Sequence, residues 1–535
     1  MKQAAGKSTL PRHTAIPAVP QCSILSLISF IARGLPLPAR CHCRCSSLLG
    51  KFSALACGSF QGNIDAWQNA MLHEKSPREL RRLVHRHFRR LGANLLSSVK
   101  LTQMSPEKIL QRVTVENIES MDSRFRAGIP VVLVLSHLGI WELFAQLMPK
   151  FVGYVRNASV YQRLGNRFID AHVRRTRSQT GLELFDRKDG FQPVIDLLRS
   201  GGGVGVLSDQ HAGDHGLWTP FFGRLASTSP LPGLLAKRTR AAVIAAAVYT
   251  TGPARWRMVF TERFDQPDAS IADLTSKINK VIERVAPEDW FWVHNRWKTP
   301  QPNFLLARYK RGIHLPPGIS AHDLKPFRIL VRSSNWVGDA VMSVPAVRAI
   351  KNGRPDAQVT IAAPSKIAPM WKLVPGVDAI IPLPNGSLLS AVGLLRRRSL
   401  FDVAILFPNS SRVALESWLS GIPRTVGYHG HWRRWLLNQT VPEPRKSGPP
   451  EHHSLRFVRI ARECGAETST VQHPTSNIQI TVADQTLKIG LCPGAEYGPA
   501  RPNDGSRSDS PRWPQRLAGK HQRNGFCSER RTTRR

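Results

Sequence analysis

Acidic residues are missing from the start of the chain, since no Asp or Glu precedes Asp65. The whole sequence has 75 Lys and Arg against 37 Asp and Glu, a formal net charge of +38. An excess of this size predicts anionic partners: nucleic acid, an anionic membrane or acidic substrates. Cysteine is also scarce, with eight in 535 residues, which argues against a disulfide scaffold. The cluster CHCRC at 41–45 lacks the paired spacing of zinc ligands, so we expect free thiols, a reducing compartment and no metal site.

Apolar runs long enough to cross a bilayer are lacking as well. The run CSILSLISFIA at 22–32 is too short to span. A signal peptide is one interpretation, but LPLPARCHCRC is a poor cleavage site, and we favour a weak membrane-surface anchor within 1–62. Hydrophobic residues make up 41% of the chain, enough to form sizeable cores.

The segment 63–298 predicts an α/β domain. It opens with SPRELRRLVHRHFRRLGANLLSSVKL, a basic amphipathic helix whose Arg face is either solvated or a binding surface. Apolar strand patterns such as IPVVLVLS and VGVLSDQ then alternate with helical patterns, and this alternation is typical of layered α/β folds.

A Pro-rich stretch at 299–326 is interpreted as a linker. Short apolar strands separated by helices resume at 327–500 and predict a parallel, Rossmann-like sheet. The tail at 501–535 has ten basic and three acidic residues and no apolar periodicity, so we expect it to be disordered.

A first candidate site lies in LSHLGIWELF, directly after a buried strand. His137 and Glu142 would face apart on one helix. If His137 is in the loop, Gly139 makes a tight turn and Glu142 begins the helix, the carboxylate can reach back to the imidazole. A carboxylate there would make His137 a general base. A helix cap with a satisfied polar pair is the simpler alternative.

HLGIWE is followed in order by YQRLGNRF, RTRSQTG, VLSDQHAGDHGLWTPFFGR and ASTSPLPGLLAKRTRA. This set resembles the lysophospholipid acyltransferase superfamily, and within it the lipid A late acyltransferases, from about Ser76 to Trp297. The resemblance implies that His137 deprotonates a hydroxyl of a lipid A precursor, which attacks the thioester of an acyl carrier protein, and that Glu142 orients His137. No cofactor is implied.

The same resemblance implies substrate-binding roles for Arg177 and Asp209. Arg177 would contact phosphate or stabilise an oxyanion; otherwise it is a helix-surface arginine. Asp209 follows a strand, where α/β sheets gather functional groups; otherwise it caps a turn. A carrier protein, a lipid A precursor and the inner-membrane surface are all anionic, which suits the basic charge. Nucleic-acid binding is the rival explanation, but no reader motif supports it.

A second candidate site lies in ILVRSSNWVGDAVMSVPAVRAIK, where Asp339 follows a strand. With VPGVDAIIPLP, IPRTVGYHGHWRRWLLNQTVP and LCPGAEYGPA, it resembles the ADP-heptose:lipopolysaccharide heptosyltransferases, which have a GT-B fold. The resemblance implies that Asp339 is the base for an acceptor hydroxyl. Arg424, Arg433 and Arg434 would meet acidic groups of the acceptor, unless they form a solvated basic turn.

The family pattern stops near Ala500, where a second Rossmann domain that binds ADP-heptose would follow. We therefore expect the N-terminal half of a GT-B enzyme, shortened by truncation or a frame shift and inactive alone. The combined expectation is a fusion acting at the cytoplasmic face of the inner membrane. The alternatives are an active bifunctional enzyme and a membrane-surface scaffold without catalysis.

Overall fold

The computed structural model describes residues 76–468, apart from 266, 267, 285, 301, 310, 385, 399, 400, 431 and 444–451. The predicted N-terminal segment 1–62, the tail 501–535 and the last part of the second predicted domain, 469–500, lie outside these residues. Both sheets of the structure fall in the same compact unit of the chain. In the part that is described, no helix is long and apolar enough to cross a membrane.

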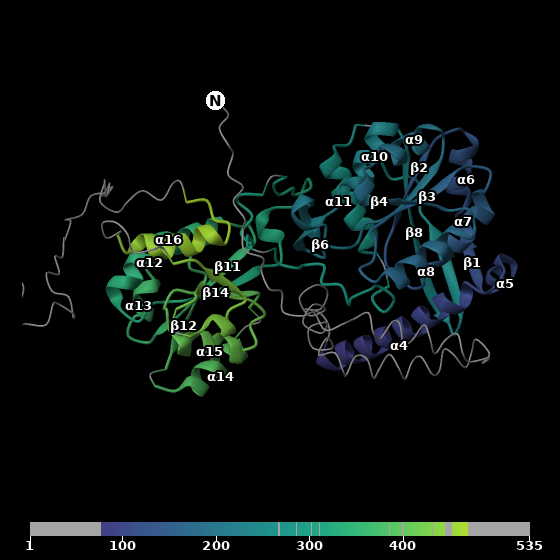
Figure 1. The fold of residues 1–535 in the computed structure, drawn as a ribbon. Helices are drawn as coiled ribbons and strands as arrows, with labels where there is room; N and C mark the ends of the chain where they lie inside the picture. The colour runs from purple at the N-terminus through teal and green to yellow at the C-terminus, as the bar shows by residue number, and fades with distance from the viewer. Residues whose placement is uncertain are drawn as a thin grey trace, which may run out of the picture. The chain divides into compact units, whose positions relative to one another are not determined.

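The first sheet has seven strands in the order β1-β9-β8-β2-β5-β3-β4 (Figure 1). Its neighbours are parallel except β8 and β9, which pair antiparallel. The strands are β1 (Val113–Glu116), β2 (Val131–Leu135), β3 (Asn157–Tyr161), β4 (Glu183–Asp186), β5 (Gly203–Leu207), β8 (Ala242–Gly252) and β9 (Arg255–Phe260). This sheet confirms the predicted α/β class.

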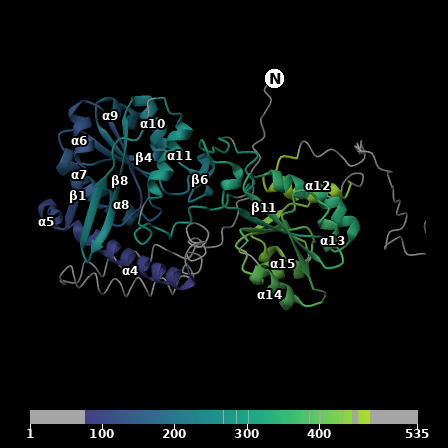
Figure 2. The same ribbon diagram turned by 180° about the vertical axis from the view of Figure 1, so that it is seen from behind.

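Both faces of this sheet are covered, because alternate residues of a strand point to opposite sides. In β2, Val131, Leu133 and Leu135 pack in one apolar cluster, whereas Val132 packs in another. The helices are α4 (Pro77–Leu101), α5 (Pro106–Leu110), α6 (Glu119–Arg126), α7 (Leu143–Val152), α8 (Arg167–Ser178), α9 (Gln192–Arg199), α10 (Leu231–Thr239) and α11 (Ile271–Ile282). Residues of α6 and α7 join the first cluster, and residues of α9 and α10 join the second. Figure 2 shows the same layers from behind.

Helix α4 is amphipathic as predicted. Ser76 caps its N-terminus in a capping box with Glu79, which satisfies free backbone N–H groups. Its apolar residues Leu80, Val84 and Phe88 are buried in a cluster with Trp290 and Trp292. A two-stranded hairpin that the sequence patterns did not reveal, β6 (Leu217–Phe221) with β7 (Arg224–Thr228), contributes to the same cluster.

The second sheet has six parallel strands in the order β12-β11-β10-β13-β14-β15. In chain order this is 3-2-1-4-5-6, the doubly wound Rossmann arrangement. Its strands are β10 (Phe327–Arg332), β11 (Ala357–Pro364), β12 (Ala379–Leu383), β13 (Val403–Leu406), β14 (Thr425–Tyr428) and β15 (Gln439–Val441).

Helices cover both faces of the second sheet. They are α12 (Val337–Asn352), α13 (Ala368–Trp371), α14 (Leu388–Arg398), α15 (Ser411–Leu419) and α16 (Ser454–Glu463). One apolar cluster contains α12, α13 and α16, and the other contains α14 and α15. The predicted Rossmann-like sheet is therefore present.

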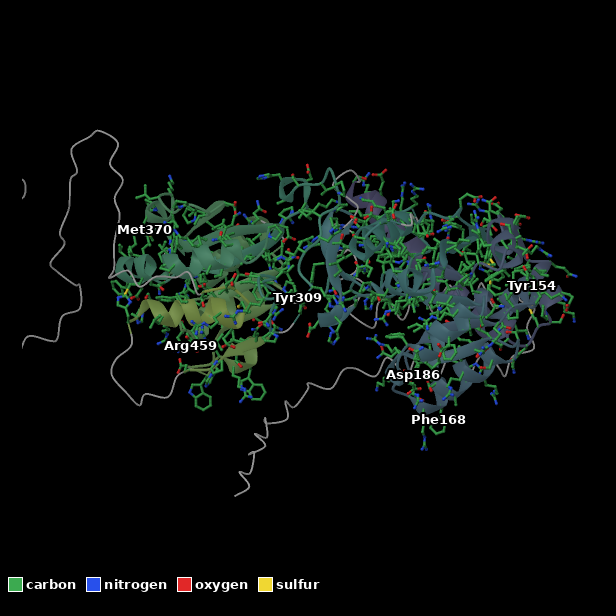
Figure 3. All side chains as sticks on the ribbon, turned by 90° about the horizontal axis from the view of Figure 1, so that it is seen from above. Tyr154, Phe168, Asp186, Tyr309, Met370 and Arg459 are labelled. Carbon is green, nitrogen blue, oxygen red and sulfur yellow. The ribbon has the colours of Figure 1, made fainter. Side chains whose placement is uncertain are left out.

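The Pro-rich segment 299–326 is packed, which its interpretation as a linker did not anticipate. Phe304 and Leu305 are fully buried in the core of the second sheet, and Leu306 and Leu324 pack with Trp218 of the β6–β7 hairpin. Tyr309, labelled in Figure 3, donates from its hydroxyl to Asp214 Oδ1 at 2.8 Å. An ion pair of 2.8 Å between Arg224 NH2 and Asp402 Oδ1 also joins the two halves.

Candidate active site

His137 stands in the loop after β2, at the carboxyl edge of the first sheet. Gly139 makes the turn with φ +57°, and a Cβ there would lie 2.2 Å from the Val248 carbonyl oxygen. Glycine is therefore required for both its left-handed backbone and the close approach. The loop pairs with residues 289–291: Gly139 N–H donates to the Asp289 carbonyl, and Phe291 N–H donates to the His137 carbonyl.

The carboxylate that holds His137 is Asp209, located after β5, next to β2 in the sheet. The imidazole Nδ1 lies 2.7 Å from Asp209 Oδ1, and the His137 backbone N–H donates to Oδ2 at 2.7 Å. The indole of Trp290 also donates to Oδ2 at 2.7 Å. These contacts place the Nδ1 proton toward Asp209 and leave the Nε2 lone pair available as a base.

The surroundings of Asp209 favour the ionised form of its carboxyl group. Asp209 is only 2% exposed, and this burial would raise the pKa of its carboxyl. The charge of His137 and the hydrogen bonds from His137 and Trp290 nevertheless hold the pKa of Asp209 below its usual range. An ionised Asp209 stabilises the imidazolium that forms when His137 takes a proton.

Glu142 is hydrogen-bonded to Arg177, a partner that the sequence-based prediction did not include, so its predicted role in orienting His137 stays a prediction. It precedes α7, as expected, but both of its oxygens accept from Arg177: Nε to Oε2 at 2.9 Å and NH2 to Oε1 at 2.6 Å. Burial would raise the pKa of Glu142, yet the charge and hydrogen bonds of Arg177 lower it. The five-residue spacing did not reveal this partner because Arg177 comes from α8, 35 residues away.

Arg177 is paired with a carboxylate through Nε and NH2, and its predicted contact with phosphate or an oxyanion stays a prediction. Burial would lower the pKa of its guanidinium, but Glu142 raises it. The pair lies beside a narrow apolar cavity lined by β2, β5 and α7, including Leu133, Gly205 and Phe144. Bidentate pairing fixes both side chains at the polar end of this cavity.

Several residues near His137 were not found from the sequence. Trp141 lies edge-on to the imidazole with ring centroids 5.0 Å apart, and Phe291 lies at 6.1 Å. The amide nitrogen of Gln210 is 3.4 Å from His137 Nε2. The aromatic run DWFWVHNRW at 289–297 was the signal that could have pointed to this wall of the site.

In the second half, Asp339 lies in the first turn of α12, beyond the carboxyl end of β10. Strand order reverses between β10 and β13, and ligands of doubly wound sheets bind in the crevice at that point. The Asp339 carboxylate is 35% exposed, and Oδ1 lies 3.7 Å from His453 Nε2. The predicted position of Asp339 at a ligand-binding edge therefore agrees with the fold.

Two of the three arginines predicted to bind acidic groups are buried structural residues. Arg433 is fully buried, and its Nε donates to the Tyr428 carbonyl at 2.6 Å. Arg424 is 3% exposed and donates to the carbonyls of Pro300 and Pro302. Burial lowers the pKa of both guanidinium groups to about 10. Arg434 is exposed, so only this residue of the three keeps its predicted availability.

The buried strand, the turn and the Asp209-bound imidazole define an α/β protein with a histidine–aspartate pair at the carboxyl edge of its sheet. The chain belongs to the bacterial lipid A biosynthesis acyltransferase family, whose family model matches residues 18–299. It is 26% identical to the lipid A biosynthesis myristoyltransferase of Escherichia coli, over 44% of this chain and 75% of that protein. The family match thus covers the part of the chain that contains the first sheet and His137.

The chain is also similar to lipopolysaccharide heptosyltransferase 2. Identity is 29% to the Escherichia coli protein and 30% to the Salmonella typhimurium protein, in each over 32% of this chain. This chain spans 56% of the length of either relative. A solved structure of Escherichia coli ADP-heptose lps heptosyltransferase II shares 30% identity over 26% of this chain and 41% of that one, with a TM-score of 0.23. The second half is thus similar in sequence to part of the heptosyltransferases of lipopolysaccharide biosynthesis.

Proposed function

We propose that the first half transfers an acyl chain from an acyl carrier protein thioester to a hydroxyl of a lipid A precursor. The observation that carries this proposal is the His137–Asp209 pair at the carboxyl edge of the sheet. His137 Nε2 takes the hydroxyl proton while the oxygen attacks the thioester carbonyl. The tetrahedral intermediate then breaks its C–S bond, and the imidazolium returns the proton to the departing thiolate.

The surroundings of His137 support this chemistry. Asp209 holds the tautomer of His137 and balances the charge of its imidazolium form, as the aspartate of a Ser-His-Asp triad does. The apolar cavity beside Trp141 and Glu142 offers hydrocarbon-compatible walls for an acyl chain. The formal charge of +38 suits an anionic carrier protein and an anionic acceptor. We also propose that the chain acts at the cytoplasmic face of the inner membrane, where both substrates would meet.

The proposal is tested with the purified full chain, a radiolabelled acyl carrier protein thioester and a lipid A precursor. We expect label in the lipid with the wild-type chain, and a loss of about 10²–10⁴ in rate for His137→Ala, the range for loss of a general base. His215→Ala, outside the His137–Asp209 contacts, is the matched control. Equal rates for His137→Ala and the wild-type chain would overturn the proposal.

We propose that the second half provides the acceptor side of heptose transfer and does not transfer heptose unaided. Asp339 follows the carboxyl end of β10 and its side chain is partly exposed, so that a base there could meet an acceptor hydroxyl. The chain spans only about half of each matching heptosyltransferase, and positioning of the donor is a large part of such a rate.

This second proposal is tested by incubating the full chain with ADP-heptose and a heptose-terminated acceptor. We expect the same background for the wild-type chain and Asp339→Asn. Transfer by the wild-type chain that disappears in Asp339→Asn would show that a donor site exists after all.

A further inference from the structure

Two tryptophans after β14 stand almost wholly in solvent. Trp432 is 94% exposed and Trp435 is 90% exposed. Among the other described tryptophans, Trp218, Trp290 and Trp371 are buried, and Trp336 and Trp418 are exposed to a smaller extent, 37% and 57%. Burying an aromatic side chain of this size removes about 150–250 Å² from water. The exposure of both residues therefore forgoes stabilisation and needs an explanation outside the core.

The fold itself imposes this exposure. Arg433, between the two tryptophans, is fully buried, and its NH1 donates to the Pro408 carbonyl at 2.5 Å while Nε donates to Tyr428. Trp432 has φ +59°, a left-handed backbone that is unfavourable for a bulky side chain. Residues Arg434–Leu436 then form a 3-10 turn. An anchored arginine and a strained residue thus hold both indoles outward, and such strain is often kept for function.

The protruding geometry favours a soft surface over a small molecule. Small-molecule sites are concave and enclose most of their ligand, whereas side chains 94% and 90% exposed cannot form the walls of such a site. Indoles prefer the boundary between lipid and water, because their rings are apolar and their N–H groups remain hydrated. A lipid headgroup layer would accommodate two projecting indoles without a preformed cavity.

The local charge selects an anionic lipid. Arg434 is exposed between the two tryptophans in sequence. Two acids of the described residues in this half are paired with arginines: Glu416 with Arg332 and Arg412, and Glu443 with Arg456. The surface formed by Trp432, Arg434 and Trp435 therefore carries positive charge, which is attracted to anionic headgroups.

We propose that Trp432 and Trp435 insert into the headgroup region of an anionic bilayer while Arg434 pairs with lipid phosphate. The lipid contact would lie on the heptosyltransferase-like half. It rests on the proposed function in one respect, that the protein works at a membrane. Binding of a sugar or a protein by the two indoles, without binding to vesicles, would contradict this proposal.

The experiment uses the full chain and vesicles of phosphatidylethanolamine and phosphatidylglycerol, followed by flotation. We expect Trp432→Ala/Trp435→Ala to lower the vesicle-bound fraction about tenfold, as loss of two interfacial anchors predicts. The control is Leu373→Ala, since Leu373 is an 83% exposed apolar residue of the same half. It should bind like the wild-type chain. Thermal unfolding of each variant checks that the fold is kept.

Lipids brominated on the acyl chains give a readout specific to these indoles. Such lipids should quench part of the wild-type tryptophan fluorescence, and Trp432→Phe/Trp435→Phe should lose that part while still binding. The proposal is overturned if the double Ala variant floats like the wild-type chain, if the quenching is unchanged by the Phe substitutions, or if pure phosphatidylethanolamine vesicles bind equally well. These measurements detect vesicle binding and not acyl or heptose transfer. Their outcome therefore does not depend on whether the proposed enzymatic function is correct.

Discussion

At the scale of single residues, the chemistry depends on which carboxylate meets which base. Asp209 receives three hydrogen bonds, two from His137 and one from Trp290, whereas Glu142 receives two from Arg177. The two acids therefore have different roles. We propose that Asp209 controls the protonation and tautomer of His137, whereas Glu142 pairs with Arg177 beside the apolar cavity.

Asp209→Asn should lower kcat for acyl transfer by about 10²–10⁴ with little change in KM, because an amide no longer stabilises the imidazolium or the correct tautomer. Asp189→Asn, on the surface with its carboxylate 68% exposed, is the control. Steady-state kinetics checks the split. If Glu142→Gln abolishes turnover while Asp209→Asn retains it, the base is oriented by Glu142 and the present assignment fails.

Arg177→Met should destabilise the first half by about 3–5 kcal/mol, since it leaves the carboxylate of Glu142 without its bidentate partner at a site only 25% exposed. Arg174→Met, on the exposed side of the same helix, should change stability little. Unfolding in urea gives the comparison. The double variant Arg177→Met/Glu142→Gln should be more stable than Arg177→Met alone; a further loss would contradict the pairing.

At the scale of elements, helix α4 supports the loop that holds His137. His87 Nδ1 lies 3.3 Å from the Glu288 carbonyl, and Arg90 pairs with Asp289 at 2.9 Å. Asp289 in turn accepts from Gly139 N–H through its backbone carbonyl. The basic helix predicted at 76–101 therefore contributes to the position of the active-site loop as well as to the surface charge.

Burial lowers the pKa of His87 from 6.5 to about 4. In the unfolded chain His87 is protonated below about pH 6.5, whereas in the folded chain it is protonated only below about pH 4. Because the unfolded state binds more protons between these values, the free energy of unfolding should fall as the pH drops from 6.5 to 4. Thermal unfolding across that range measures the slope. His87→Phe should make the slope shallower, and Arg82→Gln, exposed on the same helix and not titrating in this pH range, should leave it unchanged. An identical slope in His87→Phe would contradict this explanation.

Arg433→Ala should destabilise the second sheet by about 2–3 kcal/mol, because the carbonyls of Tyr428 and Pro408 lose a charged donor in a buried site. Arg434→Ala should leave stability unchanged, since its side chain is exposed. Hydrogen exchange of the β14 segment distinguishes the two. Equal protection of the β14 amides in both variants would contradict a structural role of Arg433.

The sequence predicted most of the elements but few of the partners. Short apolar runs at β2, β5, β10 and β11 and the long amphipathic pattern of α4 were sufficient to locate these elements, because the strands are buried on both faces and α4 buries one face. The pairing of Glu142 with Arg177 and of His137 with Asp209 depends on how β2, β5, α7 and α8 are placed in space. The β6–β7 hairpin and the packed segment 299–326 were missed, since short, Pro-containing stretches carry little periodicity.

At the scale of the whole molecule, the two halves are joined more closely than tandem domains on a flexible linker. Phe304 and Leu305 enter the core of the second sheet while Leu306 and Leu324 pack with the hairpin of the first half. Both halves resemble enzymes of lipopolysaccharide biosynthesis.

The most direct test of the central claim is mass spectrometry of lipid A from an acyltransferase-deficient host that expresses the full chain. We predict that the wild-type chain adds the mass of one acyl group, and that His137→Ala and Asp209→Asn, at matched expression, add none. A lipid A mass that the wild-type chain leaves unchanged, or an acyl group that appears equally with His137→Ala, would contradict the account.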